Sequence, residues 1–220
     1  MRSMLPSLTL ITSRIAAALL ILGLAVAPAH AVGPVRILAF GDSLTAGYGL
    51  PESDTITTRL ADALTKMGRQ AVVINGGVSG DTSADGLSRI DWALADKPQI
   101  MILALGANDM LRGIDPATTR ANLEGIIDKA QAAGVEVVLA GMLAPPNLGN
   151  EYKSVFDAIY PGLAKTHNLL FMPFLLQDVA QKSDLNQADG LHPNGNGVAV
   201  IVRNLLPYVT QAMDKLGGAS

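Results

Sequence analysis

The chain has 220 residues, of which 49% are hydrophobic and 16% are charged, with no cysteine and a formal net charge of −3. This length and apolar content predict one folded domain and exclude a disordered chain, because burial of so many apolar residues can offset the entropy lost on ordering. The absence of cysteine excludes disulfides, a Cys nucleophile and thiolate metal sites. The mild acidity argues against nucleic acid as a partner, since a nucleic-acid-binding domain usually carries a basic stripe.

The first 31 residues have the pattern of a secretory signal peptide. Arg2 and Arg14 supply positive charge, Ile15–Ala27 is an uninterrupted apolar run, and Ala29-His30-Ala31 has the small-x-small form of a cleavage site. The alternative is an uncleaved membrane anchor. Thirteen apolar residues, however, would span only about 20 Å as a helix, against roughly 30 Å of hydrocarbon.

We therefore expect residues 1–31 to be a cleaved signal peptide and residues 32–220 to form the mature domain. Cleavage would remove two Arg and no acidic residue, which leaves a net charge of −5. The expected product is an exported monomer without a stable membrane anchor. The periplasm is its expected compartment, and full secretion is the alternative. The absence of cysteine suits an oxidising compartment, because no thiol can mispair there.

Short apolar runs alternate with amphipathic stretches along the mature chain, and this alternation predicts repeated strand–helix–strand units. The expected strands are Val35–Phe40, Ala71–Ile74, Ile100–Leu105, Val135–Ala140 and Leu169–Met172. The expected helices are Thr55–Met67, Thr82–Leu94, Pro116–Ala133, Tyr152–Thr166 and a final helix after Pro193-Asn194. In the first of these helices, Ile56, Leu60 and Leu64 fall on one face. Because a helix lies in each crossover, the strands should run mostly parallel in one α/β layered sandwich.

Four polar or glycine-rich segments lie where such a sheet binds ligands, outside the carboxyl ends of its strands. They are Gly41–Gly49, Asn75–Thr82, Gly106–Asp109 and, before the last helix, Asp189–Asn194. We therefore expect these four segments to share one edge of the sheet.

Two histidines remain once the signal peptide is removed, His167 and His192. His167 ends a predicted helix, where a cation suits the helix dipole, and it is expected to be structural. His192 follows Asp189 by three residues, so that carboxylate can orient and charge-stabilise its imidazole as in a Ser-His-Asp triad. Ser43 stands in a glycine-rich turn after a buried strand, where a neighbouring base could activate its hydroxyl.

Acyl transfer also needs hydrogen-bond donors for the tetrahedral oxyanion. The backbone amides of Ser43 and Gly80 and the side-chain amide of Asn108 could supply three. Each of the last two has a structural alternative, because Gly80 could simply require positive φ and Asn108 could cap a helix. The GxSxG elbow of α/β-hydrolases is absent, which counts against that fold.

Taken together, these segments resemble the four signature blocks of the SGNH (GDSL) hydrolases. The matching residues are Gly41-Asp42-Ser43-Leu44, Gly80 in Ser79-Gly80-Asp81-Thr82, Asn108 in Gly106-Ala107-Asn108-Asp109, and Asp189-Gly190-Leu191-His192-Pro193. The order and spacing agree over nearly the whole mature chain. Within the family, Gly41–Gly49 and Ser79–Ser83 are most similar to the periplasmic group of thioesterase I, arylesterase and lysophospholipase L1.

The resemblance implies a three-layer α/β/α sandwich with a flavodoxin-like, five-stranded sheet, and a hydrolase that uses no metal and no cofactor. Ser43 would be the nucleophile, His192 the general base and then acid, and Asp189 its orienting partner. Ser43, Gly80 and Asn108 would form the oxyanion hole. The implied substrates are small-molecule or lipid-like acyl esters and thioesters, such as aryl esters, acyl-CoA-like thioesters and lysophospholipids.

One loop departs from the family pattern. In the related group a mobile loop after the fourth strand helps to line the acyl-chain site, and here Leu148 stands where an aromatic residue often occurs. Met142, Leu143 and Leu148 are candidates for lining the acyl chain, with ordinary packing as the alternative. A preference for chain length cannot be carried over.

Three other functions have partial support in the sequence. A flavodoxin-like binding module could use Gly41–Gly47 as a phosphate cradle, but Asp42 would repel phosphate and no GxxxxGK motif is present. A metal site could use Asp42, Asp189 and His192, but hydrolytic zinc sites usually have more than one His. A carbohydrate O-acetylesterase would keep the same catalytic machinery; the single Trp and four Tyr argue against a wide aromatic platform for sugars.

Overall fold

The structure is a computed structural model that describes residues 33–217. The predicted signal peptide, residues 1–31, lies outside the described residues. Five strands form one sheet in the order β2-β1-β3-β4-β5, and every neighbouring pair is parallel. They are β1 (Val35–Gly41), β2 (Ala71–Gly77), β3 (Ile100–Ala104), β4 (Glu136–Ala140) and β5 (Leu170–Met172). This order is that of the flavodoxin-like sheets, so the expected sheet is confirmed.

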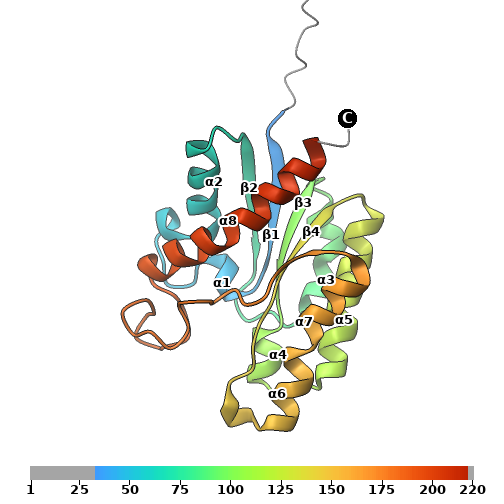
Figure 1. Ribbon diagram of the computed structural model, residues 1–220, viewed down its shortest axis with the longest axis vertical. Coiled ribbons are helices and arrows are strands. Elements are labelled where there is room, and N and C mark those ends of the chain that lie inside the picture. Colours follow the sequence, from blue (N-terminus) through green and yellow to red (C-terminus); the bar gives the residue numbers. More distant parts are fainter. Residues whose placement is uncertain (1–32, 218–220) are drawn as a thin grey trace, which may run out of the picture. The chain divides into compact units, whose positions relative to one another are not determined.

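Helices cover both faces of the sheet (Figure 1). The helices are α1 (Ser43–Ala46), α2 (Ile56–Lys66), α3 (Ser83–Leu94), α4 (Ala107–Leu111), α5 (Pro116–Ala132), α6 (Asn150–Asp157), α7 (Ile159–His167) and α8 (Gly195–Gly217). Two 3-10 turns lie at Glu52–Asp54 and Pro146–Leu148. The pair α2 and α8 packs on one face, and α3, α5 and α7 pack side by side on the other. The predicted three-layer sandwich is therefore confirmed.

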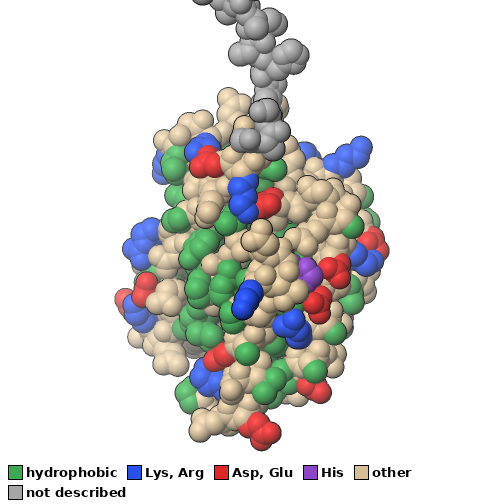
Figure 2. Space-filling model, turned by 45° about the vertical axis from the view of Figure 1, so that its right-hand side comes forward, with side chains coloured by type: hydrophobic (Ala, Val, Ile, Leu, Met, Phe, Trp, Pro, Cys, Tyr) green, Lys and Arg blue, Asp and Glu red, His purple; other side chains and the backbone are tan. Residues whose placement is uncertain are grey.

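The core lies on both faces of the central strands. Every residue of β3 is buried, as expected for a parallel strand covered by helices on both sides. Ile56, Leu60 and Leu64 of α2 are all buried, so the predicted apolar face is the one that packs. The layer of α5 and α7 comes forward in Figure 2, where acidic and basic side chains are interspersed over the visible surface.

The predicted helix Tyr152–Thr166 is instead two helices, α6 and α7, and this boundary prediction was wrong. The cause is Pro161, which has no N–H to donate to the carbonyl of Asp157 and whose ring crowds that carbonyl. The first helix ends at Asp157, one turn before the proline. An apolar pattern that continues through a proline does not reveal this break.

Two short helices were not predicted. The helices α1 and α4 are only four and five residues long, too short to show a helical period in the sequence. The strand β2 also continues through Gly76 and Gly77, which had been expected to belong to the following loop. None of the helices within residues 33–217 is long and apolar enough to cross a membrane.

The packing of α2 against the sheet gives a stability prediction. Leu60→Ala should lower the free energy of unfolding by about 2–5 kcal/mol, because Leu60 is fully buried and its removal leaves a cavity. Leu111→Ala is the matched control, since 54% of Leu111 is exposed, and it should change stability by less than about 0.5 kcal/mol. Urea unfolding of both variants measures the difference; equal losses would contradict this account of the core.

Candidate active site

The turn after β1 presents Ser43 at the carboxyl edge of the sheet. Ser43 is the first residue of α1, and Asp42 caps that helix through a 3.0 Å hydrogen bond that its Oδ1 accepts from the N–H of Leu44. Gly41 leaves no room for a side chain, because a Cβ there would lie 2.6 Å from the carbonyl oxygen of Ala104 in β3. Gly41 thus allows β1 to approach β3 closely at this point, and Ser43, two residues later, is half-buried at the edge.

The predicted triad residues form one continuous chain of hydrogen bonds. The Nε2 of His192 lies 2.9 Å from the Oγ of Ser43, although the two residues are 149 positions apart in sequence. The Nδ1 of His192 lies 2.7 Å from Oδ2 of Asp189. If Nδ1 carries the proton donated to Asp189, Nε2 is free to accept the proton of Ser43. This is the arrangement that activates a serine hydroxyl.

The carboxylate of Asp189 is held in its ionised form by hydrogen bonds. The backbone N–H and the imidazole of His192, followed by the backbone N–H of Leu191, lower the pKa of Asp189 to about 2. The two backbone bonds measure 3.0 Å from His192 and 2.9 Å from Leu191. The ring of Tyr48 packs against the imidazole at an angle of 39°, with 4.7 Å between the ring centroids. The carboxylate and Tyr48 thus restrain the imidazole from two sides.

A glutamine that the sequence analysis did not single out ties the His192 loop to the Ser43 loop. The Nε2 of Gln187 donates to the carbonyl oxygens of Tyr48, at 2.8 Å, and Pro193, at 3.0 Å. Its backbone N–H donates to the carbonyl of His192 at 2.7 Å. The sequence contains no motif that marks Gln187, because its role depends on two loops meeting in space.

The loop after β2 lies directly beside the turn that carries Ser43. The N–H of Val78 donates to the carbonyl of Gly41 at 3.0 Å. Gly80 adopts a left-handed conformation with φ of +88°. Gly80 therefore does require positive φ, which was its structural alternative. This conformation is compatible with a role for its amide as a hydrogen-bond donor. Neither Ser43 nor Gly80 uses its amide N–H in a hydrogen bond within residues 33–217.

Asn108 lies inside α4 and does not cap that helix, whose N-cap is Gly106. The Nδ2 of Asn108 donates one N–H to the carbonyl of Asp81 at 2.9 Å. A carboxamide has a second N–H, so one donor remains for a ligand. The structure brings the segments that contain Ser43, Gly80 and Asn108 together at the same edge.

A buried carboxylate fixes α4 from behind. Asp109 is fully buried and accepts hydrogen bonds from the backbone and hydroxyl of Ser83, the backbone bond measuring 2.8 Å, and from Thr119 at 3.1 Å. The hydroxyl of Ser83 in turn accepts a 3.0 Å bond from Asn122. This network joins α3, α4 and α5. In the sequence, Asp109 follows the buried strand β3 by five residues, and no motif marks it as the centre of this network.

Asp42 is the second carboxyl group near the imidazole, and its environment differs from that of Asp189. Only 1% of Asp42 is exposed, and its Oδ2 has no hydrogen-bond partner among the described residues. Burial raises the pKa of Asp42 to about 6, against the lowering effects of the Leu44 hydrogen bond and of the charge on His192.

The candidates for lining an acyl chain fall into two places. Met142 and Leu143 line an apolar groove of about 340 Å³, which also includes Gly190 and Leu191, just before His192. Leu148 lines a different hollow, beside Asn150 of α6 and Pro116 of α5. The structure therefore groups two of the three candidates with the His192 loop and separates the third.

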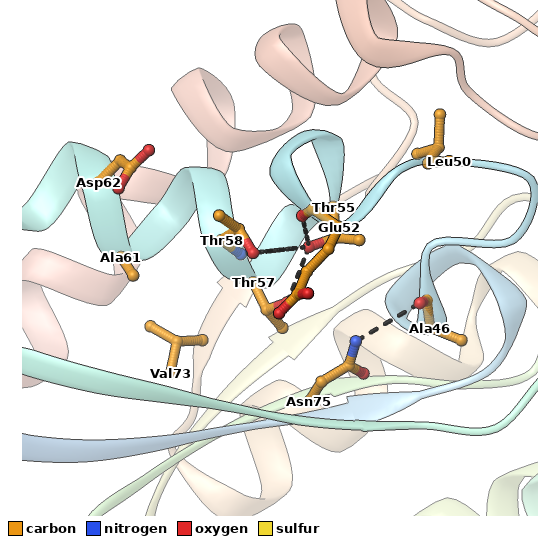
Figure 3. A pocket seen from close by; sticks show the side chains of 10 residues that line it. All are labelled: Ala46, Leu50, Glu52, Thr55, Thr57, Thr58, Ala61, Asp62, Val73 and Asn75. Atoms are coloured by element: carbon orange, nitrogen blue, oxygen red, sulfur yellow. Dashed lines mark hydrogen bonds between the residues drawn. The ribbon is translucent and has the colours of Figure 1, made fainter.

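A hollow of about 590 Å³ lies beside the Ser43 turn. It is lined mainly by α2 and the edge strand β2, including Thr57, Asp62 and Asn75, and also by Ala46 of α1 (Figure 3). His167 ends α7, with its Nε2 3.2 Å from Glu124. Within residues 33–217, no three His, Cys, Asp or Glu side chains are grouped so that they could hold a metal ion.

Comparison with known proteins gives the same result over most of the chain. Residues 39–200 match the GDSL-like Lipase/Acylhydrolase family. An arylesterase of Vibrio mimicus is 40% identical over 159 residues, covering 72% of this chain and 80% of the relative. The thioesterase 1/protease 1/lysophospholipase L1 of Escherichia coli (strain K12) is 36% identical over 180 residues, covering 81% of each chain.

Solved structures agree with the fold. AlinE4, described as an SGNH-hydrolase family esterase, is 46% identical and superposes with a TM-score of 0.70, covering 81% of this chain and 96% of that one. The crystal structure of TesA gives a TM-score of 0.77 at 36% identity. The sheet order and the hydrogen-bonded Ser43–His192–Asp189 arrangement agree with these matches. The chain therefore belongs to the GDSL-like lipase/acylhydrolase family, the SGNH hydrolases.

Proposed function

We propose that this protein hydrolyses acyl esters and thioesters through an acyl-enzyme formed on Ser43. The observation that carries the proposal is the chain of hydrogen bonds from Asp189 through His192 to Ser43, at 2.7 and 2.9 Å. Membership of an acylhydrolase family supports the reaction class. The relatives named arylesterase and thioesterase support both ester and thioester substrates.

In the first half-reaction, the Oγ of Ser43 attacks the acyl carbonyl while Nε2 of His192 takes its proton. The resulting tetrahedral oxyanion would accept hydrogen bonds from the amides of Ser43 and Gly80 and from Nδ2 of Asn108. Asp189 holds the imidazole in place and stabilises its positive charge. His192 then gives its proton to the leaving alcohol or thiol, and the acyl group remains on Ser43.

In the second half-reaction, a water molecule replaces the leaving group. His192 takes a proton from the water as its oxygen attacks the acyl-enzyme, and the same donors stabilise the second oxyanion. The Ser43–acyl bond then breaks, and the imidazole returns its proton to Oγ. The carboxylic acid leaves, and the enzyme is restored without a metal or a cofactor in any step.

The apolar groove beside the His192 loop supports an acyl chain as the part of the substrate that gives affinity. Met110, Met142 and Leu143 line it, together with Leu191, and buried apolar area is the main source of affinity for such a chain. Since the groove adjoins the residue that precedes His192, an acyl chain lying in it would have its carbonyl end near Ser43.

We also propose that residues 1–31 direct export and that the mature enzyme acts in the periplasm. The charged start, the apolar run and the small-x-small site support export. The absence of cysteine suits an oxidising compartment.

Hydrolysis of nitrophenyl esters from acetate to dodecanoate tests the nucleophile and the acyl site together. Residues 32–220 should be most active on medium or long chains, because those chains can fill the groove. Ser43→Ala should lower kcat at least about 10⁴-fold, since no acyl-enzyme can form. Thermal unfolding of the variant provides the control for an intact fold.

Equal rates with and without the Ser43 hydroxyl would refute this serine as the nucleophile. Activity confined to the acetate ester would keep the serine mechanism but remove the long-chain acyl group from the proposal. In that case O-acetyl groups would be the substrate class.

The roles of the other two triad residues predict a ranking. Asp189→Asn should remain at least about tenfold more active than His192→Ala, because an orienting residue contributes less than the proton acceptor. Activity of the wild type should also fall in acid, when the protonated imidazole can no longer accept the proton of Ser43. The kcat values of both variants and a pH profile of kcat/KM check this. The reverse ranking, or a profile without an acid limb, would contradict the assignment.

The buried carboxyl of Asp42 predicts how stability changes with pH. Its pKa is about 6 in the folded chain against an ordinary value of 3.8, so the folded state holds this proton more tightly. The associated stabilisation is present below pH 4 and is lost as pH rises through 6, on the order of 3 kcal/mol in total. Between pH 4 and 7 the wild type should therefore lose unfolding free energy relative to Asp42→Asn, because the asparagine side chain does not titrate. A difference that is flat with pH would show that Asp42 is ionised in both states.

A further inference from the structure

The three donors of the proposed oxyanion hole come from separate parts of the chain. Ser43 follows β1, Gly80 lies in the loop after β2, and Asn108 lies in α4 after β3. An oxyanion hole works only if its donors are fixed before the charge develops. Some group must therefore hold these three segments in fixed positions relative to one another.

One side chain on α3 contacts two of these segments directly. The Nε of Arg89 donates to Oδ2 of Asp81 at 2.6 Å, next to Gly80. Its Nη2 donates at 3.0 Å to the carbonyl of Gly41, two residues before Ser43. The guanidinium carbon lies 4.0 Å from the centroid of the Phe40 ring in β1.

Asp81 extends the connection to the third segment. Its side chain receives the hydrogen bond from Arg89, while its carbonyl oxygen accepts the bond from Nδ2 of Asn108 at 2.9 Å. The ion pair is largely shielded from water, with 19% of the Arg89 side chain and 11% of the Asp81 side chain exposed. A pair so shielded is screened less by salt than a surface pair and has a defined geometry.

We propose that Arg89 is a positioning residue for the oxyanion hole, which holds the segments of Ser43, Gly80 and Asn108 in register. This inference rests on the proposed function. Arg89 does not touch the reacting atoms. It acts through the carbonyl of Gly41, the carboxylate of Asp81 and, through the Asp81 peptide, the amide of Asn108.

The geometry requires arginine and not merely a positive charge. The two hydrogen bonds leave from Nε and Nη2, which are fixed relative to one another by the planar guanidinium, and the same plane stacks on Phe40. Lysine has a single ammonium group on a flexible chain. It could pair with Asp81, but it could not make both bonds in the same geometry while stacking on the ring.

The predicted effect is a loss of kcat with little change in KM. Arg89→Gln should lower kcat about 100-fold, the size of effect expected when a donor is displaced by about 1 Å or removed. Arg89→Lys should restore only part of this loss. KM for a nitrophenyl ester should change less than about threefold, because the groove for the acyl chain does not include Arg89.

A tetrahedral mimic separates positioning from general stability. An alkyl trifluoromethyl ketone adds to the serine and places an oxyanion in the hole, so its affinity should fall by the same factor as kcat/KM. Binding of the corresponding fatty acid, which forms no such adduct, should be unchanged. In Arg89→Ala, added guanidinium at concentrations well below those that unfold the protein should raise kcat, because the ion can occupy the space left by the side chain.

Arg36→Gln is the matched control. Arg36 also makes a side-chain hydrogen bond between elements, from Nε to the carbonyl of Asp96 at 2.8 Å, but near the start of β1, at the opposite end of that strand. Its kcat and its affinity for the ketone should stay within about threefold of the wild type. Assays are run at a temperature where circular dichroism shows every variant to be folded.

The inference is overturned if folded Arg89→Gln keeps kcat within threefold of the wild type. It is also overturned if ester, ketone and fatty acid all weaken by the same factor, or if the lysine variant is fully active. Ser43→Ala, measured in parallel, distinguishes failure of the proposed function from failure of the proposed role of Arg89. A wild type without esterase activity, or an active Ser43→Ala, refutes the proposed function itself, whereas an inactive Ser43→Ala beside a fully active Arg89→Gln refutes only the role of Arg89.

Discussion

The hydrogen bond between Ser43 and His192 depends on the parallel order of the sheet. In a parallel sheet all strands end at the same edge, so the loops after β1, β2 and β3 meet there although they are far apart in sequence. The His192 loop precedes α8, which packs on the same face as α2 and so returns the chain to this edge. Gln187 ties the two loops together, because its side chain donates a hydrogen bond to the carbonyl of Tyr48 in the loop that follows Ser43. The sheet topology thus brings the Ser43 and His192 side chains together, and only then can their hydroxyl and imidazole form the 2.9 Å contact.

The same edge concentrates buried charge, which is costly unless it is paired or hydrogen-bonded. Asp109 meets this requirement with three hydrogen bonds, and Asp81 with the ion pair to Arg89. In both cases the groups that satisfy a carboxylate also join neighbouring elements. Buried polar networks of this kind define one geometry, because any shift leaves a charge without its partners. The contacts that pair the buried charge therefore also supply the rigidity that the proposed oxyanion hole would need.

The architecture could be predicted well from the sequence, whereas the contacts that support the site could not, for a physical reason. Periodic burial of apolar side chains gave the five strands and the long helices, and fixed spacing within short motifs indicated Ser43, Asp189 and His192. Gln187 and Arg89 have no such signal, because their partners are distant residues brought near only by folding. The break before Pro161 shows the opposite limit, since a continuous apolar face concealed a local backbone constraint. Leu148 was grouped with Met142 and Leu143 because all three lie in the stretch that corresponds to the family's acyl-lining loop, but Leu148, at the end of the 3-10 turn Pro146–Leu148, lines another hollow.

Two carboxyl groups act near one imidazole, and their surroundings give them different tasks. Asp189 lies at the surface, where three hydrogen bonds hold its pKa near 2, so it remains ionised at any pH where His192 could act as a base. Asp42 lies directly before Ser43, and burial raises its pKa to about 6. A buried anion there would stabilise the imidazolium from a second side, but one of its oxygens lacks a hydrogen-bond partner among the described residues, which makes that charge costly. In the proposed mechanism the orienting role therefore falls to Asp189, the exposed carboxylate with three hydrogen bonds, while Asp42 caps the helix α1 that presents Ser43. Asp189 and Asp42 are the same residue type, and their different surroundings give them different pKa values. Only Asp189 therefore stays ionised over the whole pH range in which His192 could act as a base.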